Sequence, residues 1–297
     1  MQNSARYLIF FQYIGTKYSG VVSVAHCQPG KTGVQDHLKE ALQKLKPLDP
    51  VSVFVSSRTD KGVHALSNSA HFDLQRRHNK PPFTEDILIQ ALNYNLGTEQ
   101  IRVTRAHLVS SDFHARYHAQ SRTYVYRIAL GCGSNTPLPL TEECLLWGLR
   151  NKELDVGAMR EAAALLVGTH DFSTFAANSH ETVPKNPVKT MDMVSIQPGD
   201  SFAKSHFHRE MPLLELTFRS KSFLYKQVRR MTGVLVAVGQ GRLSVSKIAD
   251  LLEARDTHAF PKNFVAPTCG LFLTNVDYKE SDLQYSEQLL STDSAKD

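Results

Sequence analysis

The sequence contains little cysteine and tryptophan. Its 297 residues include 4 cysteines and 1 tryptophan. The cysteines are Cys27, Cys132, Cys144 and Cys269, and no two of them have C-x-x-C spacing. This spacing argues against a disulfide framework and a zinc knuckle, and it indicates reduced thiols. The histidines also lack the H-E-x-x-H spacing of a zinc site, so we expect no metal.

Long apolar runs and a strong excess of one charge are missing as well. No apolar run is long enough to cross a bilayer, and residues 1–6 lack the hydrophobic core of a secretory signal. We therefore expect no membrane partner. Lysine and arginine exceed aspartate and glutamate by 34 to 29, a formal net charge of +5. That charge permits a polyanionic partner such as RNA, although it does not demonstrate one.

The apolar residues that are present predict strands and helices in mixed order. Strands are expected at 7–13, 51–55, 101–108, 123–130, 191–197, 213–219 and 271–276. Helices are expected at 34–45, 84–96, 155–166 and 225–238. There are too few βαβ crossovers for a purely parallel sheet, which favours an α+β fold on a largely antiparallel sheet. Such a sheet can leave one face open to a large ligand.

The order of elements in the first half is repeated in the second half without obvious sequence identity. We expect an N-terminal half at 5–112, a C-terminal half at 113–280 and a polar, disordered tail at 281–297. The loops at 131–139 and 197–212 do not have the character of a flexible tether between domains.

The densest polar segment in the first half runs from Ser56 to His64, with the sequence SSRTDKGVH. Gly62 and its small polar neighbours permit a tight loop, which would present Asp60 and Arg58 at the edge of a cleft. An isolated R-T-D tripeptide is more often a β-turn with solvated charges, so this segment alone is weak evidence for a site.

The motifs around this segment and elsewhere in the chain strengthen the evidence for a site at Asp60. SSRTDKGVHALSNSAHFDL, around Asp60, resembles the R-T-D-[AK]-G-V-H signature of the TruA family of pseudouridine synthases. Further segments resemble other motifs of that family: FHARYHAQSRTYVYRI (113–128), DFSTF (171–175), SFLYKQVRRMTG (222–233) and PTCGLFL (267–273). They run in family order over nearly the whole chain, so the set is highly specific. The amino-acid sequences of these segments resemble those of a vertebrate, mitochondrial branch of the family.

The resemblance implies two RRM-like halves that form one continuous, largely antiparallel sheet flanked by helices, with a basic cleft between them. It implies an enzyme that isomerises a uridine to pseudouridine in structured RNA, with tRNA as the first expectation and mRNA or mitochondrial RNA as alternatives. No cofactor is implied. A mitochondrial location is expected, with cytoplasm and nucleus as alternatives.

The resemblance also assigns site residues. Asp60 is the catalytic carboxylate, Arg229 is its ion-pair partner, and Tyr124 lies against the uracil. Contacts with the RNA and the flipped base are implied for Arg58, Lys61, His64, Arg116, Arg122 and Leu271.

The reaction explains why these groups are needed. When the bond from C1′ to N1 breaks, the ribose becomes electron-poor, and an ionised carboxylate can meet it by covalent attack or by an addition-elimination route. A guanidinium such as that of Arg229 favours the charged form of Asp60. The base must be flipped out of the stack, and Arg58 can stack in the vacancy and bind phosphate. The Tyr124 hydroxyl would lie near C5, where a proton must leave at the end of the reaction.

Other interpretations remain open at this stage. A lone tyrosine on a strand is more often a core residue, which we expect of Tyr126, and Leu271 is core by default. Gly20 is followed by Val21-Val22 where many relatives have Trp-Gln, and the nearest glutamine is Gln28. The main alternative function is a catalytically inactive RNA-binding protein or chaperone of the same fold. A glycosidase or nuclease is a remote third, because no second carboxylate or metal cluster accompanies Asp60.

Overall fold

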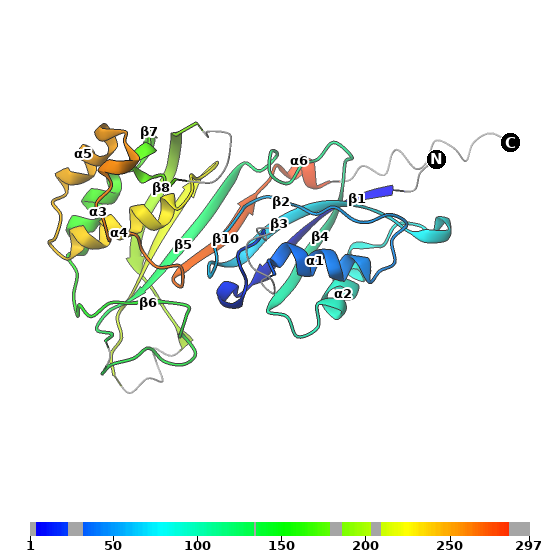
Figure 1. The fold of residues 1–297 in the computed structure, drawn as a ribbon, viewed down its shortest axis with the longest axis horizontal. Coiled ribbons are helices and arrows are strands. Elements are labelled where there is room, and N and C mark those ends of the chain that lie inside the picture. The colour runs from blue at the N-terminus through cyan, green and yellow to red at the C-terminus, as the bar shows by residue number, and fades with distance from the viewer. Residues whose placement is uncertain (1–3, 23–31, 134, 179–185, 203–208, 285–297) are drawn as a thin grey trace. The chain divides into compact units, whose positions relative to one another are not determined.

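The computed structural model describes residues 4–22, 32–133, 135–178, 186–202 and 209–284, and the statements that follow concern these residues. The chain divides into two compact units. The first unit comprises residues from 1–59, 65–120 and 276–297, and the second comprises 60–64 and 121–275. The ribbon is drawn in Figure 1.

The first unit has the element order βαββαβ. Its main elements are β1 (Ser4–Tyr13), α1 (Val34–Gln43), β2 (Phe54–Val55), β3 (His64–Gln75), α2 (Glu85–Leu96) and β4 (Ile101–Val109). Short 3-10 helices lie at Gly15–Lys17 and Arg77–Asn79, and a short helix α6 at Glu280–Leu283. The strands pair antiparallel in the order β4-β1-β3, with β2 on the far side of β3. This order is that of an RRM-like half.

The sheet of the first unit is covered on both faces along β1. Residues Tyr7 to Phe11 are all buried, although successive side chains of a strand point to opposite faces. Leu8 and Phe10 share a core cluster with Phe113 and Ala115, to which residues 278 and 283 add partly buried side chains. Both faces of β1 are therefore packed in the interior of this unit.

The second unit repeats the same order with additions. Its elements are β5 (Ser121–Ala129), β6 (Trp147–Gly148), α3 (Val156–Ala164), β7 (Gly168–Asp171), β8 (Val188–Pro198), β9 (Leu213–Ser220), α4 (Gln227–Gly239), α5 (Ser246–Ala254) and β10 (Leu271–Asp277), with 3-10 helices at Ser173–Phe175 and Thr257–Ala259. The strand order is β10-β5-β9-β8-β7, and β6 lies parallel to β5. Without the additions β6, β7 and α5, the chain order β5-α3-β8-β9-α4-β10 gives an RRM-like arrangement again.

The predicted fold class is confirmed: the molecule is α+β, with mostly antiparallel strands flanked by helices. Figure 1 shows α1 and α2 beside the strands of the first unit, and α3 and α4 beside those of the second. The continuity of the sheet between the halves and the basic cleft stay predictions.

The borders of the units differ from a single cut after residue 112. Residues 113–120 belong to the first unit because Phe113 and Ala115 complete its core cluster. Part of the expected tail is ordered as α6, where Leu283 packs on that same cluster. The remainder of the tail, 285–297, lies outside the described residues. None of the helices in the described ranges is long and apolar enough to span a membrane.

Candidate active site

Asp60 opens a tight turn. The N–H of Val63 donates to the Asp60 carbonyl at 3.1 Å, and Gly62 has a φ of +79°, which suits the third position of a type II turn. A Cβ atom at Gly62 would also lie 2.7 Å from Oγ1 of Thr268. Both the backbone conformation and the lack of space require glycine here, as the sequence predicted for the turn.

A buried polar network holds the chain just before this turn. The Asn68 amide donates to the Ser57 carbonyl at 3.1 Å and to the Tyr13 hydroxyl at 3.3 Å. That hydroxyl lies 2.8 Å from Oγ1 of Thr59. Burial raises the pKa of Tyr13 to about 12, so its phenol stays protonated and can donate at neutral pH. The backbone leading to Asp60 is thereby fixed by side chains to which the sequence had assigned no role.

The carboxylate of Asp60 forms an ion pair with Arg229. Nη1 of Arg229 donates to Oδ2 of Asp60 at 3.1 Å, and the two side chains are 14% and 24% exposed, respectively. Nε of the same guanidinium donates to the Ala266 carbonyl at 2.8 Å. The planar guanidinium is thus held by two acceptors, which fixes the direction in which it meets the carboxylate. The predicted pairing of Asp60 with Arg229 is confirmed.

The segment that supports Arg229 lies very close to α4 and β5. The Ala266 N–H donates to the Arg229 carbonyl at 3.1 Å. A Cβ atom at Gly233 would lie 1.4 Å from the Phe264 carbonyl oxygen, and one at Gly270 would lie 2.5 Å from that of Arg127. Only glycine fits at both positions, so the segment 264–270 can hold its acceptor against the arginine.

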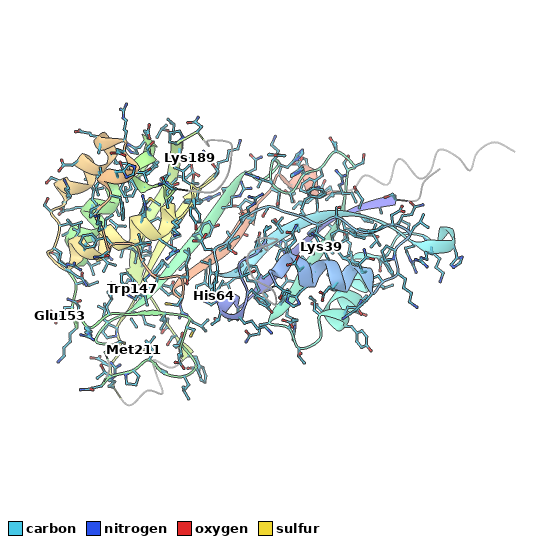
Figure 2. The ribbon with its side chains drawn as sticks, viewed as in Figure 1. Lys39, His64, Trp147, Glu153, Lys189 and Met211 are labelled. Carbon is cyan, nitrogen blue, oxygen red and sulfur yellow. The ribbon has the colours of Figure 1, made fainter. Side chains whose placement is uncertain are left out.

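His64, a predicted RNA contact, is in the interior (Figure 2). Its side chain has no exposed surface, and Nε2 lies 3.0 Å from the Cys144 carbonyl and 3.1 Å from that of Cys269. The ring stacks on Phe272 with centroids 4.7 Å apart. Burial lowers the pKa of His64, so the neutral ring can donate from Nε2. A ring without accessible surface cannot touch RNA in this structure, and His64 instead fixes the end of the Asp60 turn.

Tyr124 and Leu271 belong to adjacent strands, β5 and β10. Tyr124 is 8% exposed, and its ring meets Phe223 edge-on at 5.1 Å. Leu271 is 5% exposed. Their contacts with the uracil stay predictions. Tyr126 is fully buried and donates to the Pro267 carbonyl at 2.8 Å, so its predicted core role is confirmed.

The predicted RNA-binding arginines divide into two groups. Arg58 and Arg116 are exposed, as is Lys61, so RNA can reach all three. Arg122 is only 7% exposed, and its Nη1 donates to the Lys221 carbonyl at 2.6 Å. No local pattern indicates this burial, and in the structure Arg122 holds the backbone just after β9.

Gln227 is buried at the start of α4, where its Oε1 accepts from the Leu224 N–H at 2.8 Å. It therefore organises the entry to the helix that carries Arg229. Gln28 lies outside the described residues. Across the described ranges, no three His, Cys, Asp or Glu side chains gather as a metal site would require.

Comparisons with known proteins place the chain among relatives of one family. The family model described as tRNA pseudouridine synthase matches residues 9–118 and 162–279. The chain is 50% identical to tRNA pseudouridine synthase-like 1 of Xenopus laevis over 282 residues, covering 95% of this chain and 94% of the relative. It is 49% identical to the Homo sapiens protein of the same name over 276 residues, with 92% and 90% covered. It is also 37% identical to tRNA pseudouridine synthase A of Paramagnetospirillum magneticum, with 93% and 96% covered.

Proposed function

The chain belongs to the tRNA pseudouridine synthase family and is an RNA isomerase, and we propose that Asp60 is the carboxylate that reacts with the uridine. The observation that carries this proposal is the ion pair between Asp60 and Arg229, held by the Ala266 carbonyl. Oδ2 of Asp60 is engaged by the guanidinium, so Oδ1 is the oxygen we assign to the substrate.

The reaction moves one bond and one proton. The bond between ribose C1′ and uracil N1 breaks, the base turns in the site, and a bond forms between C1′ and C5. The proton that C5 loses is balanced by the one that N1 gains, so no oxidant, reductant or cofactor is required. Asp60 meets the electron-poor ribose either by covalent attack on C1′ or by an addition-elimination route.

Three further residues contribute to the reaction. Arg229 neutralises and orients the carboxylate in a site partly closed to water. Tyr124 offers a flat face to the uracil and a hydroxyl to the proton at C5. Arg58, exposed and two residues before Asp60, occupies the vacancy that the flipped base leaves in the RNA.

Substitution of the carboxylate tests the assignment. Asp60→Asn keeps the shape of the side chain and removes its charge, so pseudouridine formation in a tRNA transcript should fall by about a thousandfold or more. Asp250→Asn, at an exposed position of α5, is the matched control and should retain wild-type activity. Pseudouridine is mapped along the transcript, and binding of the same RNA is measured in parallel. Full activity of Asp60→Asn would refute the role of this residue.

An inactive RNA chaperone is not supported, because the family consists of synthases and the chain keeps the ion pair that the chemistry uses. We propose tRNA as the substrate class, in line with the names of the relatives, and treat mRNA and mitochondrial RNA as further substrates to be mapped. Mapping pseudouridine in total RNA from cells with and without the protein distinguishes these classes.

A mitochondrial location is proposed on the resemblance of the motifs to a mitochondrial branch of the family. Imaging of the tagged full-length chain together with a mitochondrial marker tests it. An exclusively nuclear or cytoplasmic signal would refute it.

A further inference from the structure

Four aromatic rings of the first unit form a connected group at its surface. Phe54, on the two-residue strand β2, stacks on His71 with centroids 5.0 Å apart and an interplanar angle of 17°. His71 lies 4.5 Å from His114, and His114 lies 4.3 Å from Tyr117. Phe54 is 49% exposed and Tyr117 is 71% exposed, so both ends of the group face solvent. We call Phe54, His71, His114 and Tyr117 the ring cluster.

The middle of the ring cluster is held rigidly. His71 is 3% exposed, and its Nδ1 accepts the N–H of Ala115 at 3.1 Å. Burial lowers the pKa of His71 to about 4, and burial also lowers that of His114. Both rings are therefore neutral at pH 7. Because the inner ring cannot turn without losing its hydrogen bond, the outer rings rest on a fixed, uncharged support.

Packing in the core of the unit does not account for the exposed rings of Phe54 and Tyr117. Single exposed apolar residues are ordinary on a protein surface. Tyr94, for example, is 87% exposed on α2, and within the described ranges it joins no stacked or edge-on ring pair. Phe54 and Tyr117 differ from it because the rings of His71 and His114 connect them. Flat faces prearranged in this way match what stacking on nucleobases requires.

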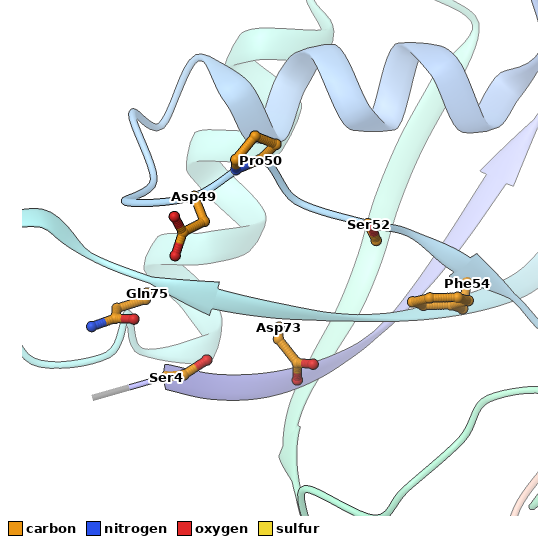
Figure 3. A pocket seen from close by; sticks show the side chains of 7 residues that line it. All are labelled: Ser4, Asp49, Pro50, Ser52, Phe54, Asp73 and Gln75. Carbon is orange, nitrogen blue, oxygen red and sulfur yellow. The ribbon is translucent and has the colours of Figure 1, made fainter. Parts of the chain in front are cut away.

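The carboxylates near Phe54 favour contact with nucleobases over contact with phosphates at this end of the ring cluster. A shallow pocket of about 220 Å³ is lined by Phe54 and by polar side chains that include Asp49, Ser52, Asp73 and Gln75 (Figure 3). Carboxylates repel phosphate, whereas they accept hydrogen bonds from the N–H groups of a base edge. Arg6 pairs with both oxygens of Asp73 at 2.7 Å and neutralises its charge, so the repulsion of phosphate falls to Asp49. At the other end, the Arg116 guanidinium lies 5.9 Å from the Tyr117 ring and can meet the backbone of the same strand.

We propose that the ring cluster is a stacking surface for unpaired nucleobases of the RNA substrate, separate from the base that reacts at Asp60. The proposal rests on the proposed function only in that the substrate is an RNA with unpaired loops. Bases stack on the exposed rings of Tyr117 and Phe54, and the base on Phe54 places its edge in the polar pocket. Stacking tolerates any base, so this surface contributes affinity more than sequence choice.

Tyr117 variants of the full-length chain test the proposal, with a tRNA transcript as the probe. Tyr117→Ala should weaken binding about tenfold, within the range measured for loss of one stacked base. Tyr117→Leu should weaken it similarly, because it keeps apolar area and loses the flat ring, whereas Tyr117→Phe should bind as the wild type does. Tyr94→Ala is the matched control for loss of an exposed tyrosine and should have no effect.

A second probe isolates the unpaired bases. Affinity for a fully paired RNA duplex of similar length should be the same for Tyr117→Ala and the wild type. Equal tRNA affinities of Tyr117→Ala, Tyr94→Ala and the wild type would overturn the proposal, and so would an equal loss on the duplex. Pseudouridine formation is followed in the same samples. A wild type that makes none, combined with a binding loss in Tyr117→Ala, would refute the proposed function and leave the stacking surface standing.

Discussion

The imidazole of His64 is fixed by two backbone carbonyls and by the ring of Phe272. The carbonyls belong to Cys144 and Cys269, which lie 80 and 205 residues away along the chain. His64 closes the same short segment that Asp60 opens, so the position of the carboxylate depends on the anchoring of this ring. A displacement of about 1 Å at a reacting group can cost roughly a hundredfold in rate.

We predict that His64→Leu lowers the single-turnover rate of pseudouridine formation by about tenfold or more and leaves the Kd for tRNA within about twofold. The leucine fills much of the volume, but it cannot donate to either carbonyl. His64→Gln can place an amide N–H near the position of Nε2, and it should restore most of the rate. Single-turnover rates and filter binding separate the two effects. If His64→Leu bound tRNA poorly but reacted normally once bound, the residue would be an RNA contact and the positioning role would be wrong.

At the scale of elements, helix α4 carries Arg229 and is in contact with a neighbouring loop at one of its glycines. A Cβ at Gly233 would meet the Phe264 carbonyl carbon and oxygen, which are backbone atoms and cannot turn away. A Cβ at Gly239 would meet the Met159 side chain at 2.5 Å, which is flexible and can adopt another rotamer. The two glycines thus share a helix and differ in what surrounds them.

We therefore expect Gly233→Ala to reduce the free energy of unfolding by about 3 kcal/mol or more, because the helix and the loop must separate. Gly239→Ala should reduce it by less, about 1 to 2 kcal/mol, since a side chain can repack where a backbone carbonyl cannot and helix propensity rises. Urea unfolding of both variants measures the difference. Gly233→Ala should also lose activity under conditions where it is still folded, because the same loop holds the acceptor of Arg229. Equal stabilities of the two variants would contradict the close packing at Gly233.

Local patterns predicted most elements correctly, since period and caps depend on neighbours in the sequence. Asp155 caps α3 as expected, with Oδ1 accepting the N–H of Ala158. The 12-residue strand β3 was not predicted, because it mixes buried His71, Asn68 and Ser69 with apolar residues and lacks a clean alternation. Helix α5 was missed as well.

The sequence motifs predicted the reactive pair of the site but not the contacts that support it. Asp60 and Arg229 were paired from the sequence resemblance, 169 residues apart, and the structure bears this out. His64 and Arg122 lie in the same motifs as exposed residues such as Arg58. The motifs therefore could not show that these two side chains are buried. The support from Asn68 and from the Ala266 carbonyl depends on contacts between distant segments, which no local pattern encodes.

For the whole molecule, the chain order and the compact units do not coincide. Residues 60–63 lie between β2 and β3 in sequence and His64 begins β3, yet 60–64 belong to the second unit. The ion pair between Asp60 and Arg229 is therefore internal to the second unit, while Arg58, two residues earlier, belongs to the first. A cut at residue 112 would separate Asp60 from Arg229 and would remove Phe113 and Ala115 from the core of the first unit. The two RRM-like halves are thus poor candidates for separate expression.

The charge of the whole molecule predicts how its RNA affinity responds to salt. With a formal net charge of +5, binding should release counterions, and log K for tRNA should fall linearly with log salt concentration. Arg58→Ala and Arg116→Ala each remove an exposed guanidinium that we assign to the RNA, so each should reduce the magnitude of that slope by about one. Lys247→Ala is the control and should leave the slope unchanged. Its ammonium already pairs with Asp250 on α5 at 3.3 Å, and we assign it no contact with RNA.

Tyr117→Ala carries no change of charge and should lower the affinity by the same factor at every salt concentration, leaving the slope unchanged. Titrations from about 50 to 200 mM salt resolve the two behaviours, since they cover the range in which phosphate contacts lose most affinity. A slope that Arg58→Ala and Arg116→Ala leave unaltered would place the RNA backbone elsewhere on the molecule. A slope that Tyr117→Ala alters would mean that the tyrosine acts through Arg116, because removal of the ring can displace the guanidinium beside it.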